Sequence, residues 1–190
     1  MASGARAVFL DRDGTINREV HLLRNLRQLR LLPGAAEGIR ALNRMGYRVI
    51  VVTNQPVVAR GWVSEKQLQS IHRTIEERLR RRGARLDAIL YCPHHPDANL
   101  PRYRLRCRCR KPGTALIRRA ARRFGIALGR SFMVGDSTRD ILAGQRAGLT
   151  TVLLGTGYAG RDGTYPVRPD HLARNLKDAA RLLRRLEEKP

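Results

Sequence analysis

The chain has 190 residues and a formal net charge of +22, from 38 lysines and arginines against 16 aspartates and glutamates. This length allows the buried core of one α/β domain, and the 42% of apolar residues is typical of a globular protein. The lack of a ~20-residue apolar run and of a signal-peptide pattern argues against membrane and secreted classes and predicts a cytoplasmic protein without a membrane partner.

Short apolar runs rich in branched residues alternate with helical patterns along the chain. In chain order, strands are predicted at 7–10, 48–53, 86–91, 131–135 and 150–154, and helices at 34–45, 64–82, 112–124, 138–147 and 175–188. Ser64 is the predicted N-cap of the second helix. This alternation predicts an α/β fold with a three-layer, Rossmann-like, mostly parallel sheet. No repeat or linker interrupts the pattern, so we expect a single domain over residues 1–190.

The first predicted strand runs into the sequence Asp-Arg-Asp-Gly-Thr at residues 11–15. The carboxyl ends of parallel strands form the edge where open α/β sheets bind ligands. Two crowded carboxylates such as Asp11 and Asp13 repel each other unless a cation neutralises one and the other holds a proton. That division suits a nucleophile beside a general acid or base. The alternative is an acidic turn that caps the next helix.

Polar residues at the other strand ends favour the catalytic interpretation. The second strand is followed by a hydroxyl and two amides that could hold a phosphoryl oxygen, on Thr53, Asn54 and Gln55. Lys111 lies just before a helix that Pro112 is predicted to begin, and Asp136 and Asp140 follow the fourth strand. Carboxylates beside a phosphate suit Mg²⁺, so the sequence predicts a phosphate and magnesium site at this edge.

These four segments resemble, in the same order, the four motifs of the haloacid dehalogenase (HAD) superfamily. The spacings, the Arg110-Lys111-Pro112 step and a cysteine loop make the chain similar over nearly its whole length to the D-glycero-D-manno-heptose 1,7-bisphosphate 7-phosphatase family. The resemblance implies an HAD-like phosphatase, a phosphomonoester hydrolase that uses Mg²⁺ and a phospho-aspartate intermediate. It implies removal of the C7 phosphate from a small sugar bisphosphate.

The resemblance also implies a role for each matching residue. Asp11 would be the nucleophile and Asp13 the acid and base, while Thr53 and Lys111 would hold the transferring phosphoryl oxygens. Mg²⁺ would lie between Asp11, Asp136 and the backbone carbonyl of Asp13. We expect Asn54, Gln55 and Arg110 to contact the substrate, and Asp140 to brace the group by bonding Lys111.

All three cysteines lie in one long insert, about residues 92–111, as Cys92-x-His94 and Cys107-x-Cys109. An odd number of clustered cysteines in a cytoplasmic protein favours metal ligands over disulfides. Three thiols and one imidazole fill a tetrahedral Zn²⁺ site and leave no open position, so the zinc would be structural. The same spacing occurs in the zinc loop of the resembled family. The alternative, three reduced thiols, leaves the insert without an anchor.

The spacing between the motifs leaves no room for a separate cap domain, so the zinc loop is expected to form a wall of an open site. We expect the arginines of this loop to lie near Lys111 and to offer a second phosphate their planar forks: Arg102, Arg104, Arg106, Arg108 and Arg110. Two departures from the family leave the substrate open. Residues 19–22 are Glu-Val-His-Leu in place of a segment with Gly and Tyr, and Ser137 replaces a frequent Lys.

Several functions remain in competition. The first is a heptose bisphosphate phosphatase of lipopolysaccharide or related carbohydrate assembly, acting as a monomer on a small phosphorylated sugar. A histidinol-phosphate phosphatase or another small-phosphomonoester phosphatase shares the motifs and the loop. The positive charge raises a third class, a zinc nucleic-acid-binding protein or a 3′-phosphatase of nucleic-acid ends. Helical arginine clusters at 78–85, 118–123 and 181–185 instead predict solvated faces, so we expect no specific nucleic-acid partner.

Overall fold

The computed structural model describes residues 4–188 and contains one six-stranded sheet. Its strands are β1 (Ala7–Leu10), β2 (Arg48–Asn54), β3 (Ala88–Cys92), β4 (Phe132–Gly135), β5 (Thr150–Leu154) and β6 (His171–Ala173). Their spatial order is β3-β2-β1-β4-β5-β6, and every pairing is parallel. Leu10, at the end of β1, pairs with Val51 on one side and Val134 on the other. The ends of β1, β2 and β4 are therefore neighbours.

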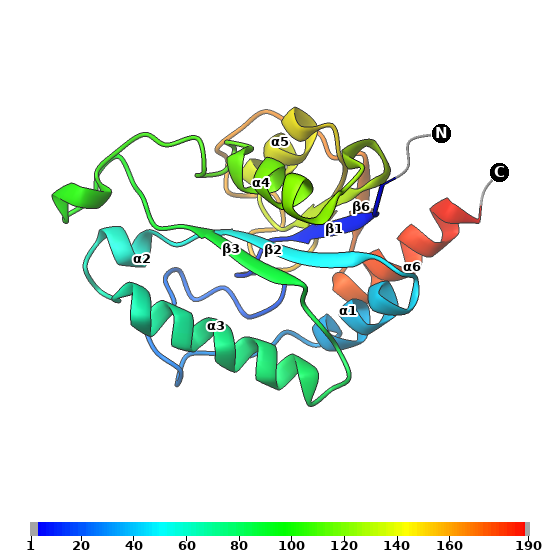
Figure 1. Ribbon diagram of the computed structural model, residues 1–190, viewed down its shortest axis with the longest axis horizontal. Coiled ribbons are helices and arrows are strands. Elements are labelled where there is room, and N and C mark those ends of the chain that lie inside the picture. Colours follow the sequence, from blue (N-terminus) through cyan, green and yellow to red (C-terminus); the bar gives the residue numbers. More distant parts are fainter. Residues whose placement is uncertain (1–3, 189–190) are drawn as a thin grey trace.

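Helices cover both faces of this sheet (Figure 1). On one face lie α1 (Ala35–Arg44), α3 (Glu65–Arg80) and α6 (Leu176–Glu187), and on the other lie α4 (Ala115–Phe124) and α5 (Thr138–Ala147). The short α2 (Pro56–Ala59) follows β2, and 3₁₀ turns occupy Pro101–Tyr103 and Leu128–Arg130. This arrangement confirms the predicted three-layer, Rossmann-like α/β fold.

The strands β1, β2, β3 and β4 divide their side chains between two apolar cores. In β1, Val8 and Leu10 join the core under α1, α3 and α6, whereas Ala7 and Phe9 join the core under α4 and α5. All four side chains are fully buried. Fully burying an apolar side chain stabilises the fold by about 1.5–3 kcal/mol. The burial of both faces thus fixes the strand that carries the first acid pair.

The predicted elements are found with small shifts at their ends, and Ser64 caps α3 through a capping box with Gln67. One expectation is wrong, and one strand was missed. Pro112 does not begin a helix, because α4 begins at Ala115 and the N–H of Gly113 is bonded to the Arg110 carbonyl in a turn. The edge strand β6 was not predicted, since its three residues include Leu172, which is 73% exposed and forms no apolar run.

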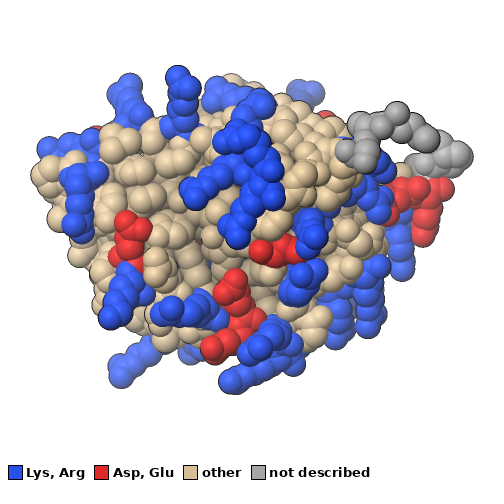
Figure 2. Space-filling view, in the orientation of Figure 1, with Lys and Arg blue, Asp and Glu red and all other residues tan. Residues whose placement is uncertain are grey.

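Within residues 4–188, none of the helices has the length and apolar character needed to cross a membrane. The basic side chains are spread over the face seen in Figure 2, with a few acidic side chains between them. On α4 and α6, all seven arginines of the predicted solvated clusters are exposed: Arg118, Arg119, Arg122, Arg123, Arg181, Arg184 and Arg185. The helical clusters therefore contribute surface charge, as expected.

Candidate active site and metal centre

The two acids of the first motif follow β1 at the point where the strand order reverses. From β1 the chain passes to β2 on one side, and the second half of the sheet begins with β4 on the other. Asp11 comes directly after β1, and its backbone N–H is bonded to the Val134 carbonyl of β4 at 3.0 Å. A parallel sheet binds ligands in the crevice at such a switch point. The first motif is therefore placed where a substrate can reach it.

Lys111 is buried between two carboxylates. Its Nζ lies 2.8 Å from Oδ1 of Asp11 and 2.6 Å from Oδ1 of Asp140. Burial opposes the charge of Lys111, but the two carboxylates outweigh it and raise the lysine pKa above its usual value. The second oxygen of Asp140 accepts hydrogen bonds from the N–H and hydroxyl of Ser137. Asp140 thus holds Lys111 against Asp11, as the sequence suggested.

The carboxylates of Asp11, Asp136 and Asp140 converge, with one oxygen from each within 4.8 Å of the others. Burial raises the pKa of Asp11 to about 6; Lys111 opposes this rise, while Asp140 and Asp13 add to it. Burial, followed by repulsion from Asp11 and Asp140, raises the pKa of Asp136 to about 8. The single charge of Lys111 cannot balance three carboxylates, and oxygen donors suit a hard divalent cation. These donors fit Mg²⁺.

Two glycines enclose the Asp136 carboxylate. A Cβ on Gly14 would lie 2.2 Å from Oδ2 of Asp136, and a Cβ on Gly157 would lie 2.0 Å from the same oxygen. Both glycines also have positive φ angles, of 77° and 56°, which other residues rarely adopt. The oxygen accepts a hydrogen bond from the N–H of Tyr158 at 2.7 Å. Gly14 of the first motif and Gly157, after β5, thus form the seat of this acid.

Asp13 is held by donors on every side. Its Oδ2 accepts from Arg12 at 2.8 Å and from Gln55 at 2.9 Å, and its Oδ1 accepts from Asn17 at 2.8 Å. Burial raises the pKa of Asp13, but Arg12 and the amide donors outweigh burial and lower it overall. Arg12 is itself fully buried and lies 3.1 Å from Nε2 of His72. No pattern in the sequence indicates this support, because Arg12 and His72 are 60 residues apart.

The residues after β2 contact other site residues. Gln55 Nε2 donates to Thr53 Oγ1 at 2.9 Å as well as to Asp13, so this amide links the two. Asn54 accepts from the Lys111 N–H at 2.9 Å and donates to the Lys111 carbonyl at 3.1 Å. The oxygen and the nitrogen of the Asn54 amide are therefore both bonded to the Lys111 backbone. It does so across 57 residues.

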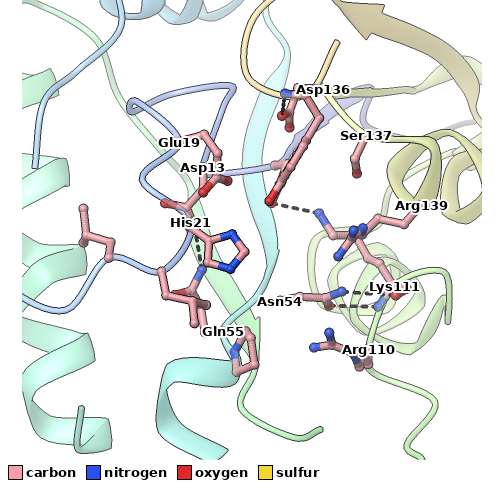
Figure 3. A pocket seen from close by; sticks show the side chains of 15 residues that line it. Asp13, Glu19, His21, Asn54, Gln55, Arg110, Lys111, Asp136, Ser137 and Arg139 are labelled. Atoms are coloured by element: carbon pink, nitrogen blue, oxygen red, sulfur yellow. Dashed lines mark hydrogen bonds and ion pairs between the residues drawn. The ribbon is translucent and has the colours of Figure 1, made fainter. Parts of the chain in front are cut away.

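A pocket opens over these groups (Figure 3). Its lining includes Asp11, Asp13, Asn54, Gln55, Arg110, Lys111 and Asp136, together with residues for which we predicted no role: Glu19, His21, Leu22, Leu23, Pro56, Ser137, Arg139 and Tyr158. Only Arg110 of the five loop arginines lines it, because the other four are exposed on the zinc loop. The expectation that all five gather near Lys111 is therefore wrong.

The predicted zinc ligands converge at one point. Donor atoms of Cys92, His94, Cys107 and Cys109 all lie within 4.8 Å of one another, and the three sulfurs are 3.0–3.3 Å apart. These separations are far longer than the ~2.05 Å of a disulfide bond. Burial raises the pKa of the Cys92 thiol, and a cation would favour the thiolate. A tetrahedral Cys₃His set fits Zn²⁺.

Glu65, the first residue of α3, joins the cysteine loop to α3 and β3. This carboxylate accepts from the hydroxyls of Tyr91 at 2.6 Å and Tyr103 at 2.8 Å. Nη1 of Arg110 donates to the His94 carbonyl at 3.3 Å. Since Arg110 also lines the pocket, the metal cluster and the pocket share one wall.

Replacing Cys107 with serine should remove most of the bound zinc and destabilise the fold. Structural zinc binding is coupled to folding, so we expect the free energy of unfolding to fall by at least about 2 kcal/mol. Metal analysis and chemical denaturation of the purified protein would measure both. Arg106→Ala is the matched control, because Arg106 is exposed beside the cluster and donates no ligand. A wild-type protein without zinc, purified without chelator, would contradict the assignment.

Comparison with known proteins places this geometry in a family. The model of a family described as "HAD-hyrolase-like" matches residues 108–179. A D-glycero-beta-D-manno-heptose-1,7-bisphosphate 7-phosphatase from Rhodopseudomonas palustris is 43% identical over 143 residues, covering 75% of this chain and 79% of the relative. This chain belongs to the heptose-1,7-bisphosphate 7-phosphatase family. The membership confirms the resemblance on which the sequence-based function was predicted.

Other members of the heptose-bisphosphate phosphatase family extend the match to nearly the whole chain. A D-glycero-alpha-D-manno-heptose-1,7-bisphosphate 7-phosphatase from Photorhabdus laumondii is 35% identical and covers 94% of this chain and 96% of the relative. The crystal structure of a D,D-heptose 1,7-bisphosphate phosphatase from B. bronchiseptica, complexed with magnesium and phosphate, is 33% identical. It has a TM-score of 0.83 and covers 96% of this chain and 99% of the other. The HAD-type phosphatase fold of this chain is therefore shared with an experimentally determined family member.

Proposed function

We propose that this chain is a Mg²⁺-dependent phosphatase that removes the C7 phosphate from D-glycero-D-manno-heptose 1,7-bisphosphate through a phospho-aspartate at Asp11. The observation that carries the proposal is the meeting of Asp11, Lys111 and Asp136 at one sheet edge. Family membership supports the substrate class. Relatives named for the alpha and the beta anomer both match, so the proposed substrate includes both anomers.

The proposed reaction begins with in-line attack of an Asp11 carboxylate oxygen on phosphorus. The P–O bond to the sugar breaks, and the leaving oxygen takes a proton from Asp13. Thr53 and Lys111 hold the phosphoryl oxygens during transfer, which is catalysed mostly by positioning and charge stabilisation. Water then hydrolyses the acyl phosphate while Asp13 takes up its proton, and Asp11 is regenerated.

The surroundings of Asp13 suit both halves of this cycle. Arg12, Asn17 and Gln55 favour its ionised form, which is the form that accepts a proton from water. A dianionic phosphate beside the carboxylate raises its pKa, so binding of substrate favours the protonated form that the first half requires. Arg12 is fixed by His72, and this keeps Asp13 oriented throughout.

Two metal ions complete the proposal. Mg²⁺ would be held by Asp11, Asp136 and the backbone carbonyl of Asp13, and when bound it supplies positive charge to the transferring phosphoryl group. Zn²⁺ would be held by Cys92, His94, Cys107 and Cys109 and has a structural role. The three free cysteines suit a reducing compartment, which supports a cytoplasmic enzyme.

Arg110 is the proposed contact for the second phosphate of the bisphosphate. It lines the pocket and precedes Lys111, so its guanidinium lies beside the site of phosphoryl transfer. Guanidinium binds phosphate through two parallel hydrogen bonds. Asn54 and Gln55 line the same pocket, and we assign them to holding Lys111 and Asp13 in position for the substrate.

A substrate panel tests this proposal. We expect the highest kcat/KM for heptose 1,7-bisphosphate, and lower values for histidinol phosphate and for a DNA oligonucleotide with a 3′-phosphate. EDTA should stop turnover and excess Mg²⁺ should restore it, since Mg²⁺ binds through few protein ligands and exchanges readily. Zinc analysis after a brief EDTA treatment should still find the structural metal. A preference for either alternative substrate, or turnover that persists in EDTA, would overturn the proposal.

A further inference from the structure

A second arginine in the pocket has almost no partner of its own. Arg139 lies in the first turn of α5 and lines the same pocket as Arg110. Within residues 4–188, its one ion-pair partner is Asp162, at the long separation of 3.7 Å between Nη2 and Oδ2. Its Nε is buried and donates to no acceptor among these residues. A buried guanidinium N–H without an acceptor costs free energy. A bound ligand with an acceptor oxygen would remove this cost.

Asp162 is already engaged elsewhere. Its Oδ1 accepts from the N–H of Thr138 at 2.8 Å, and its Oδ2 accepts from the Thr138 hydroxyl at 2.8 Å. The carboxylate thereby caps the beginning of α5 and fastens the segment after β5 to it. Both carboxylate oxygens of Asp162 thus have hydrogen-bond donors other than Arg139. The guanidinium of Arg139 is therefore available to a ligand.

Arg110 and Arg139 share the side of the pocket that carries Lys111, opposite Asp13, Glu19 and His21 (Figure 3). Two guanidiniums that repel each other in a pocket form a favourable site for an anion with several oxygens. Asp11 and Asp140 form ion pairs with Lys111, so these carboxylates do not neutralise the charges of Arg110 and Arg139.

We propose that Arg139 joins Arg110 in binding the second phosphate of the substrate, and so selects bisphosphates over monophosphates. The inference rests on the proposed function and adds a residue to which the sequence analysis assigned no role. The reacting phosphate is held by Thr53 and Lys111. The distal phosphate needs a separate set of donors, and the two arginines provide it beside the first. Arg139 is thus a specificity-determining residue.

The test compares heptose 1,7-bisphosphate with heptose 7-phosphate. For Arg139→Ala, kcat/KM on the bisphosphate should fall about ten- to a hundredfold, the range of a charge-assisted hydrogen bond. The loss should appear mainly in KM, because the distal phosphate is bound equally before and during transfer. Turnover of the monophosphate should stay within about twofold of wild type. Arg139→Lys keeps the charge without the fork and should give an intermediate loss.

Arg146→Ala is the matched control, since Arg146 is exposed on the same helix and the charge change is the same. It should leave both substrates unaffected. Equal losses on the two substrates with Arg139→Ala would mean that Arg139 only stabilises α5, and would overturn the inference. A preference for the bisphosphate that is as large in Arg139→Ala as in wild type would overturn it as well. A wild-type enzyme that turns over only the monophosphate would overturn the proposed function together with it.

Discussion

Replacing Asp11 with asparagine should abolish turnover while leaving the fold intact. An amide cannot form the acyl phosphate, and loss of a nucleophile that acts with a general base lowers kcat by at least about 10⁴-fold. The fold should persist, because Lys111 keeps Asp140 at 2.6 Å and the change relieves repulsion among three carboxylates. Steady-state kinetics with heptose 1,7-bisphosphate, together with thermal unfolding, would check both expectations.

Two further variants make this result specific to Asp11. Asp97→Asn makes the same chemical change on an exposed side chain of the zinc loop and should retain full activity. Asp13→Asn should also be severely impaired, but it keeps the nucleophile and should accumulate phosphorylated protein slowly, visible as an added phosphoryl group by mass spectrometry. Substantial turnover by a pure Asp11→Asn preparation would rule out the covalent mechanism.

Replacing Lys111 with methionine should damage both catalysis and stability. Loss of a preorganised charge on the phosphoryl oxygens costs about 10²–10³-fold in kcat. In the fold, Asp11 and Asp140 would be left as buried carboxylates without a cation, and breaking such a pair costs about 3–5 kcal/mol. Methionine has a similar length and shape, so packing changes little. Chemical denaturation and kinetics should therefore both show a large loss.

Mg²⁺ gives a second readout of the same variant. Mg²⁺ binds only the folded site, so it should recover part of the lost stability by mass action. Lys66→Met is the control, because Lys66 is an exposed lysine of α3 and its replacement should change neither quantity. An unfolding free energy of Lys111→Met equal to that of wild type would show that the lysine is not needed to balance the two carboxylates.

The sheet and its major helices could be predicted because their signals are local. Apolar runs rich in branched residues marked five of the six strands, and helical spacing marked the major helices, so the errors in these elements were confined to their ends. Pro112 was misplaced because its neighbourhood is shaped by the turn that joins Arg110 to Gly113. Leu172 belongs to an edge strand whose exposure removes the apolar pattern that prediction requires.

The acids and the cysteines of the candidate sites could also be anticipated, since they occupy fixed places after strands or share a short spacing. The contacts that hold these side chains in place could not be anticipated. Asn54 was predicted to contact the substrate, but its hydrogen bonds to the backbone of Lys111 were not foreseen. His72 sits on an ordinary helical pattern, and only packing brings it to Arg12. Contacts between such distant positions depend on tertiary geometry, which one sequence does not reveal.

The two glycines that enclose the Asp136 carboxylate affect how a map of tolerated substitutions for this protein should be interpreted. Gly14 and Gly157 provide no chemical group, yet a single methyl group on either would collide with the carboxylate. The backbone angles of both positions add a second penalty for any other residue. Neither glycine can be compensated by a smaller neighbour, because the colliding group is the acid itself. In such a map these two positions would be as intolerant as the acids, although neither glycine takes part in the reaction.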